Sequence, residues 1–320
     1  MGTLYIIGNG FDLTHGLPTK YWDFRRFLEA CDWEFLVRLE ELFGIAQIDP
    51  GDPYVNVEAW KKGIDHVLWG SLEEKLAYPD IEAMVSCSDS VVDQLYLDGG
   101  NWGIESTMDA YWEQQYGFVK KLSSYVEAWI KSIDLCEVVP KKQELIGLKE
   151  GKVLTFNYTS TLEKCYRVAP EIIEHIHGGL EPFAEEPPIM GHGDRQSAMV
   201  HRNKAHEAQQ LYDEGATSIE NAIADYFDRT LKDTEHIIRQ KHRFFESLTD
   251  VDRVVVLGLS YSNVDFPYLR EIKKHLQSKA RWTMSYYTPD DKQKLEKTVG
   301  KLGIEKELVD IIHSDNYFSL

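Results

Sequence analysis

The sequence has few cysteines, no long apolar run and a deficit of basic residues, and each shortage excludes a class of protein. No CxxC pair occurs, so neither a zinc ribbon nor a dithiol redox motif is expected. Scattered cysteines of this kind are typical of reduced, mostly buried thiols in a cytoplasmic protein. The four cysteines are Cys31, Cys87, Cys136 and Cys165.

Long apolar segments are missing as well. No run approaches the roughly 20 residues that a membrane-spanning helix requires. An apolar strand begins near residue 4, which leaves no room for a signal peptide ahead of it. We therefore expect a cytoplasmic protein that makes no contact with a membrane.

Positive charge is scarce. Lys and Arg number 35 against 53 Asp and Glu, for a formal net charge of −18. Such a surface repels nucleic-acid phosphates unless a basic patch compensates. The strongest basic stretch, 236–243, carries Ile237 and Ile238 and is followed by Phe244, a pattern that indicates the solvated face of a helix. We do not expect a nucleic-acid partner. P-loop and HExxH motifs are absent from the sequence too.

Short apolar runs predict a buried β-sheet. Runs without strict alternation are typical of a mostly parallel sheet covered on both faces, and parallel strands require helical crossovers. The crossover helices are expected at 267–276 and 290–302. The expected strands lie at 4–7, 152–156, 172–176, 253–258, 282–287 and 309–312.

Helical periodicity fills most of the remaining chain. It predicts a single Rossmann-like α/β domain over residues 1–320, with large helical insertions at about residues 20–145 and 200–248. A glycine-rich loop is expected at 99–103, inside the first insertion.

Glycines and small polar residues follow four of the predicted strands. In open α/β sheets, ligands bind beyond the carboxyl ends of the strands, so these ends are candidate ligand contacts. The first, Gly8-Asn9-Gly10, lacks the third glycine of the dinucleotide fingerprint, because Leu13 stands there. The other three ends are 155–159, 177–179 and 258–265.

Three of these segments carry a resemblance to a known family. The sequence IGNGFDLTHGLPT at 7–19, with FNYT at 156–159 and HIHG at 175–178, resembles the bacteriophage abortive-infection AbiH family. The resemblance extends over nearly the whole chain. It implies a role in antiphage defence, with a phage component or a partner protein as the trigger, and it leaves open whether the protein forms a homo-oligomer.

A more distant resemblance implies a chemistry. GNGFDLTHGLP at 8–18 is similar to the sirtuin motif GAGIS-x-x-x-GIP. TFNYT at 155–159 is similar to TQNID, and HG at 177–178 and GLS at 258–260 follow as HG and GTS do in sirtuins. In sirtuins and sirtuin-like defence NADases, these elements bind NAD and break its nicotinamide–ribose bond.

The sirtuin resemblance implies a sirtuin-like nucleotide pocket with NAD as the substrate. It makes Asn157 the residue that positions ribose and water, and His177 the general base; Asp12 is the third catalytic candidate. An imidazole accepts a proton near neutral pH, and an amide both donates and accepts hydrogen bonds, as an oxocarbenium-like transition state requires. The candidate cofactor-binding residues are Gly8, Asn9, Gly10, Phe11, Thr155, Tyr158, Gly258, Ser260 and Asp265.

Departures from the sirtuin pattern support alternatives. The four-cysteine zinc module is absent, which argues against protein deacylation. Asp12 replaces the sirtuin serine, where it would repel a pyrophosphate unless it points away, toward ribose hydroxyls or an amide. Thr159 replaces the Asp of TQNID. These two changes favour a catalytically silent nucleotide-binding sensor or interaction module, and a nuclease-type effector is a third alternative.

A metal site is the less favoured interpretation of the histidines. His175 and His177 have a metal-ligand spacing, and Asp12 or His192 could complete such a site, but we expect no metal. The polar turn at 191–194 is expected to be a surface loop, and a substrate-facing loop is the alternative, because His192 stands between two glycines that would expose it.

A serine hydrolase is a further alternative, built on Ser260. Its partners would be Asp265 and either His275 or His313, but Ser262 would crowd the strained turn of a nucleophile elbow. Asp265 is instead expected to cap the helix that follows it.

Overall fold

The computed structural model describes residues 2–87 and 104–318, so the loop expected at 99–103 lies outside the described residues. The chain divides into two compact units. The first comprises residues 1–20, 126–189 and 233–320, and the second comprises 21–125 and 190–232. The second unit therefore overlaps the stretches expected as helical insertions, whereas 126–145 and 233–248 belong to the first unit.

A six-stranded, all-parallel sheet forms the centre of the first unit, which confirms the predicted α/β fold class. The strand order is β3-β2-β1-β4-β5-β6, so the chain steps outward from β1 in one direction and then in the other. The carboxyl ends of β1 and β4 flank the point where the order reverses, which is where open α/β sheets bind ligands. The strands are β1 (Gly2–Ile7), β2 (Lys152–Thr155), β3 (Ile173–His175), β4 (Val251–Leu257), β5 (Arg281–Tyr286) and β6 (Val309–His313).

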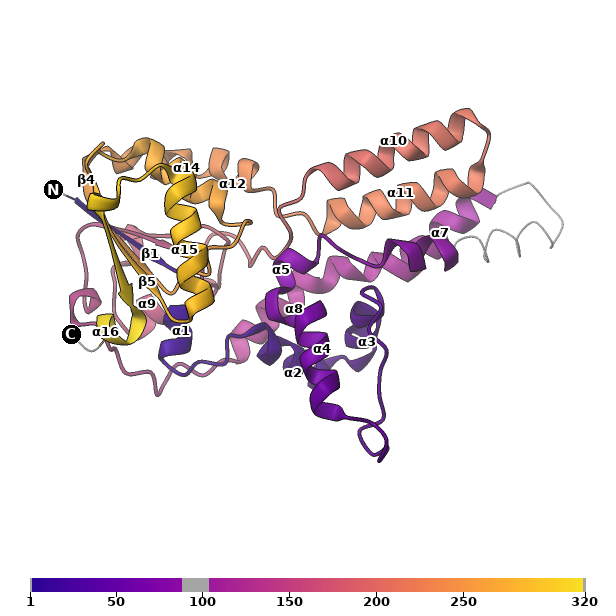
Figure 1. Cartoon of the computed structure of the whole chain (residues 1–320), viewed down its shortest axis with the longest axis horizontal. Helices are drawn as coiled ribbons and strands as arrows, with labels where there is room; N and C mark the ends of the chain where they lie inside the picture. The colour runs from indigo at the N-terminus through magenta and orange to yellow at the C-terminus, as the bar shows by residue number, and fades with distance from the viewer. Residues whose placement is uncertain (1, 88–103, 319–320) are drawn as a thin grey trace. The chain divides into compact units, whose positions relative to one another are not determined.

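Apolar side chains leave the sheet on both faces. In β1, Leu4 and Ile6 enter one buried core, while Tyr5 and Ile7 enter the other. Helices α14 (Phe266–His275) and α15 (Pro289–Leu302) pack on the first face, as Figure 1 shows. The second face is covered in part by α1 (Asn9–Thr14), α9 (Thr161–Lys164) and α16 (Ser314–Phe318). Burial on both faces explains why the strand sequences do not alternate strictly.

The basic stretch belongs to two short helices of the first unit, α12 (Thr234–Gln240) and α13 (His242–Glu246). Ile237 is buried in the core of the first sheet face, with Ile238 and Phe244 packed against the same cluster. Lys241 pairs with Glu174 at 2.8 Å. The stretch is thus amphipathic, as predicted, but it forms two short helices and not one.

Helices make up most of the second unit in its described part. Helices α10 and α11 form an antiparallel hairpin, and α7 lies alongside α11 (Figure 1). Its helices are α2 (Tyr21–Cys31), α3 (Trp33–Glu41), α4 (Val57–Val67), α5 (Leu72–Lys75), α7 (Ile104–Tyr116), α10 (Gln196–Gln210) and α11 (Glu214–Arg229), and α8 (Leu122–Ser132) begins in this unit and ends in the first.

Two surface properties complete the fold. The expectation of mostly buried thiols is wrong: Cys31, Cys87 and Cys136 are exposed, and Cys165 is only partly buried, although it packs against the core of the second sheet face. None of the helices in 2–87 and 104–318 is both long enough and apolar enough to cross a membrane.

Candidate functional site

Three glycines bring the loops after β1 and β4 into backbone contact. The Gly8 amide donates to Leu257 O at 2.9 Å, and the Gly10 amide donates to Gly258 O at 2.8 Å. A Cβ on Gly10 would lie 2.7 Å from Gly258 Cα. Gly258 itself has φ +67°, and a Cβ there would lie 2.2 Å from Phe11 N. The glycines are therefore required because the two loop backbones lie against each other. This contact joins the loops at the point where the strand order reverses.

The rest of the opening motif holds its own loop in place. The Asn9 side chain donates to Thr19 O at 2.7 Å, which closes the segment from α1 to residue 19. His15 contacts Phe11 O at 2.7 Å through Nδ1 and the Tyr166 hydroxyl at 2.8 Å through Nε2. Phe11 is fully buried in the core of the second sheet face. These contacts fix the start of α1 and with it the position of Asp12.

Asp12 is buried at the carboxyl edge, with 1% of its surface exposed. Its Oδ2 accepts a hydrogen bond from the Thr159 hydroxyl at 2.6 Å, and the Thr161 hydroxyl donates to Thr159 Oγ1 at 3.1 Å. Burial raises the pKa of the Asp12 carboxyl to about 6, although hydrogen bonds from Thr159 and Thr161 oppose the rise; the Glu163 charge adds to it. The carboxylate thus faces the threonines after β2 rather than solvent, and its burial keeps the pKa well above that of an ordinary aspartate.

His175 and Glu163 form a second buried pair beside Asp12. His175 Nε2 lies 2.6 Å from Glu163 Oε1, and both side chains are almost fully buried. The strand register places His175 opposite Thr155, at the end of β3. No motif in the sequence singles out Thr161 or Glu163, although both follow Thr159 at two-residue steps just after the strand. We call the set Asp12, Asn157, Thr159, Thr161, Glu163 and His175 the carboxyl-edge cluster.

Asn157 belongs to this cluster. Its amide is close enough to the Asp12 carboxyl to lower that group's pKa. Its backbone N–H donates to the Thr155 hydroxyl at 3.1 Å, which shapes the exit of β2. Three acceptor atoms here are buried and make no hydrogen bond of ordinary geometry to any residue that the structure describes: Asp12 Oδ1, Asn157 Oδ1 and Glu163 Oε2. A buried acceptor without a donor is costly, so such groups indicate a bound molecule or water.

His177 lies in the turn after β3 and contacts different residues from His175. Its ring packs edge-on against Phe156 and Tyr268, with centroids 5.1 and 5.3 Å away. Its Nε2 lies 3.8 Å from Asp265 Oδ1, in the segment that follows β4. The two histidines thus make different contacts: His175 pairs with Glu163, and His177 lies near Asp265. Among the residues that are described, no group of three or more His, Cys, Asp or Glu side chains is arranged to hold a metal ion.

The remaining candidates differ in exposure. Asn9 and Ser260 are exposed, whereas Thr155 is buried. The Tyr158 hydroxyl donates to Ile189 O at 2.9 Å. The structure thus brings Asp12 and Asn157 together in one cluster, and His177 and Asp265 together in one pair. The glycines hold the loops after β1 and β4 against each other.

The alternatives built on later residues make other contacts. His275 pairs with Glu271 at 2.9 Å and His313 contacts Tyr287 O at 2.9 Å, so their observed partners lie away from Ser260. The predicted surface loop at His192 is wrong: its side chain is fully buried in the second unit, against Phe227. Its N–H donates to Thr230 O at 2.9 Å, and its carbonyl accepts from the Lys232 N–H at 2.8 Å, so this pairing with the chain after α11 holds His192 in the core.

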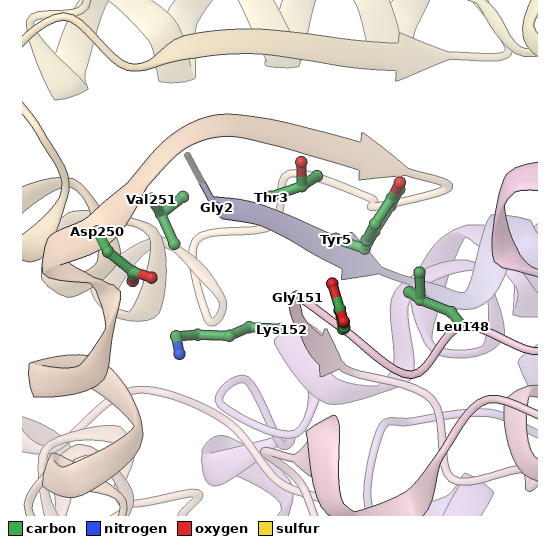
Figure 2. A pocket seen from close by; sticks show the side chains of 9 residues that line it. Gly2, Thr3, Tyr5, Leu148, Gly151, Lys152, Asp250 and Val251 are labelled. Atoms are coloured by element: carbon green, nitrogen blue, oxygen red, sulfur yellow. The ribbon is translucent and has the colours of Figure 1, made fainter.

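A cavity of about 330 Å³ lies at the opposite end of the strands. Figure 2 shows Gly2 and Thr3 at the start of β1, with Lys152 and Asp250 beside them. These residues come from the amino ends of β1, β2 and β4, so the cavity is separate from the carboxyl-edge cluster. Ligands of open α/β sheets bind at the carboxyl ends, and we do not assign the candidate site to this cavity.

One comparison with known proteins gives a match. A family model described as "Bacteriophage abortive infection AbiH" matches residues 4–286, a range that includes every residue of the carboxyl-edge cluster. No curated protein and no solved structure matches the chain.

Proposed function

The chain belongs to the AbiH family of bacteriophage abortive infection, and from that premise we propose that it hydrolyses the N-glycosidic bond of NAD or a related nucleotide at the carboxyl edge of its first unit. Depletion of a nucleotide from an infected cell would arrest phage growth. The proposal assigns the protein to the cytoplasm, where such nucleotides are held. It is consistent with the acidic surface, which disfavours a nucleic-acid substrate.

One observation carries the proposal: the Asn157 amide oxygen is buried beside Asp12 and has no hydrogen-bond donor among the residues described. The hydroxyl groups of a ribose, or an attacking water, are donors of the required kind. The site lies beside the reversal of strand order, where nucleotides bind in open α/β sheets. The likeness of 155–159 to the sirtuin TQNID segment supports the same role for Asn157.

Asp12, Asn157 and His177 each have a separate role in the proposed reaction. Cleavage of the nicotinamide–ribose bond proceeds through an oxocarbenium-like state, which a nearby carboxylate stabilises electrostatically. Asp12 supplies that carboxylate in its ionised form, and Asn157 orients the attacking water. His177 accepts the proton of the water as the bond to the ribose carbon forms. Nicotinamide and ADP-ribose are the products.

The direct test measures nicotinamide release from NAD by purified protein, with and without extract of phage-infected cells as a source of the trigger. We expect release by the wild type and a loss of at least about a hundredfold in Asn157→Ala and in His177→Ala. Ser278→Ala is the matched control, because Ser278 is exposed, belongs to the first unit and is not among the candidate site residues. Equal release by the wild type and both variants would contradict the proposal.

A second candidate is a nucleotide-binding sensor without catalysis. The hydrogen bond from Thr159 to Asp12 favours it, because this contact already engages the carboxylate in the free protein. Thermal-shift titration with NAD and ADP-ribose separates the two functions. A sensor is stabilised by nucleotide but releases no nicotinamide under any triggering condition.

A further inference from the structure

Asp265 is held in an unusual way at the start of α14. It occupies the N-cap position, where an aspartate carboxylate ordinarily accepts from the first helical amides. Here, within the described part of the chain, no such capping bond forms. Instead Oδ2 accepts from the Ser262 hydroxyl at 3.0 Å, and the Asp265 N–H donates back to Ser262 Oγ at 3.2 Å. Asp265 is therefore the N-cap residue of α14, as predicted, but its carboxylate bonds to Ser262 and not to the helix amides.

The other carboxylate oxygen faces His177. The distance from Asp265 Oδ1 to His177 Nε2 is 3.8 Å, within ion-pair range and beyond hydrogen-bond range. Both side chains are at least nine-tenths buried. Catalytic hydrogen bonds are often long in a free enzyme and shorten when substrate binds. The spacing therefore suits a pair that tightens in the complex.

The chain around His177 fixes the imidazole from the other sides. Phe156 and Tyr268 pack against the ring. Gly178 has φ +71°, and a Cβ there would lie 2.1 Å from Pro187 O, so only glycine allows the chain to fold back directly after His177. The Ile189 N–H then donates to His177 O at 2.8 Å. Few ring orientations remain, and the one adopted directs Nε2 toward Asp265.

We propose that Asp265 is a positioning residue, which accepts the Nε2 proton of His177 and so leaves Nδ1 as the atom that takes the proton from water. This assignment rests on the proposed function and replaces the predicted role of Asp265 in cofactor binding. A carboxylate that holds one ring nitrogen in its protonated form sets the tautomer of the other and stabilises the imidazolium that forms. Because Asp265 follows β4 and His177 follows β3, the pair also links the two halves of the carboxyl edge.

The kinetic test uses Asp265→Asn in the full chain. We expect kcat for nicotinamide release to fall at least about a hundredfold, with KM changed less than about threefold, because the substrate contacts remain. Asp265→Glu should recover part of the loss, since it keeps a carboxylate within reach of His177. Asp250→Asn is the matched control: it makes the same substitution at an exposed carboxylate just before β4, so its kcat should stay within about twofold of the wild type. A change in KM alone would return Asp265 to cofactor binding.

A spectroscopic test needs no activity. In protein labelled with ¹⁵N-histidine, His177→Gln identifies the His177 ring signals. We expect the wild type to show protonated Nε2 and unprotonated Nδ1, and Asp265→Asn to shift that tautomer balance. An unchanged tautomer would overturn the positioning role whether or not NAD is cleaved. If Asp265→Asn alters the tautomer but the wild type releases no nicotinamide, the pair is upheld and the proposed reaction is rejected.

Discussion

Gly258 illustrates how much of the site depends on single residues. Its φ is positive, and a Cβ added there would lie only 2.2 Å from Phe11 N, so no room exists for a side chain. We expect Gly258→Ala to lower the free energy of unfolding by roughly 3 kcal/mol, from left-handed strain together with overpacking. Chemical denaturation measures the loss. Gly16→Ala is the control: φ is +77° there, but nothing lies within 4 Å of its Cβ, so about 1 kcal/mol of strain is expected. Equal losses would contradict the backbone contact.

Asp12 makes stability depend on pH in a direction opposite to that of a salt-bridged aspartate. Its pKa is about 6 in the folded chain against an ordinary 3.8, so the folded state binds more protons between these values. The free energy of unfolding therefore falls as pH rises from about 4 to about 6, by about 3 kcal/mol for this group. Asp12→Asn should remove that fall, measured by denaturant titration across the range.

Asp194 provides the opposite sign in the same experiment. Although burial raises the pKa of its carboxyl, hydrogen bonds from Ser197 and nearby amides outweigh it and lower the pKa. Asp194 therefore contributes stability that is lost as pH falls, and Asp194→Asn should flatten the acid side of the curve. If Asp12→Asn and the wild type have the same slope between pH 4 and 6, the buried carboxylate does not titrate as inferred.

At the scale of elements, a buried ion pair joins α2 to α3 in the second unit. Arg25 Nε donates to Glu40 Oε1 at 2.7 Å, and Glu40 is fully buried. Trp69 Nε1 and Gln47 Nε2 donate to the same carboxylate at 2.7 and 2.6 Å. Three donors from separate segments of the unit bond to this one carboxylate, so Glu40 holds these segments together.

Removal of that carboxylate should be costly. We expect Glu40→Ala to destabilise the protein by about 3–5 kcal/mol, because it leaves the buried Arg25 charge with only the half-exposed Glu29, 3.6 Å away, as a carboxylate partner. Thermal unfolding monitored by tryptophan fluorescence reports the change. Glu58→Ala is the comparison, since its pair with Lys61 is exposed and should contribute little. A small effect of Glu40→Ala would mean that water replaces the carboxylate.

At the scale of the whole molecule, we expect the ligand to bind to only one of the two compact units. All the proposed ligand contacts belong to the first unit. In hydrogen exchange with NAD present, we expect slower exchange at 8–16, 155–163 and 258–266, because bound ligand suppresses local opening. Helices α10 and α11 should exchange at unchanged rates. Protection confined to these two helices would place the ligand in the second unit and contradict the site.

The strands and the opening motif could be predicted because their signals are local. Val254, Val255 and Val256 form a buried run whose burial requires only neighbouring strands on either side. The buried acceptors around Asp12 were harder to predict from the sequence. Glu163 and Thr161 stand in a four-residue helix with no motif, and their importance comes from His175 and Asp12, which lie outside that helix. His192 shows the reverse failure, because its flanking glycines suggest exposure and its pairing with the chain beyond α11 buries it.

The sequence alone determined a parallel α/β sheet with polar residues after its strands, because hydrophobic patterning and glycine turns are properties of a few adjacent residues. Only the tertiary structure decided the strand order and the partners of those polar residues. The contacts of Asp12 with Thr159 and of His177 with Asp265 join residues that are distant in sequence. Such contacts form only when the strands assemble into the sheet, and no local pattern encodes which of several buried polar groups will meet.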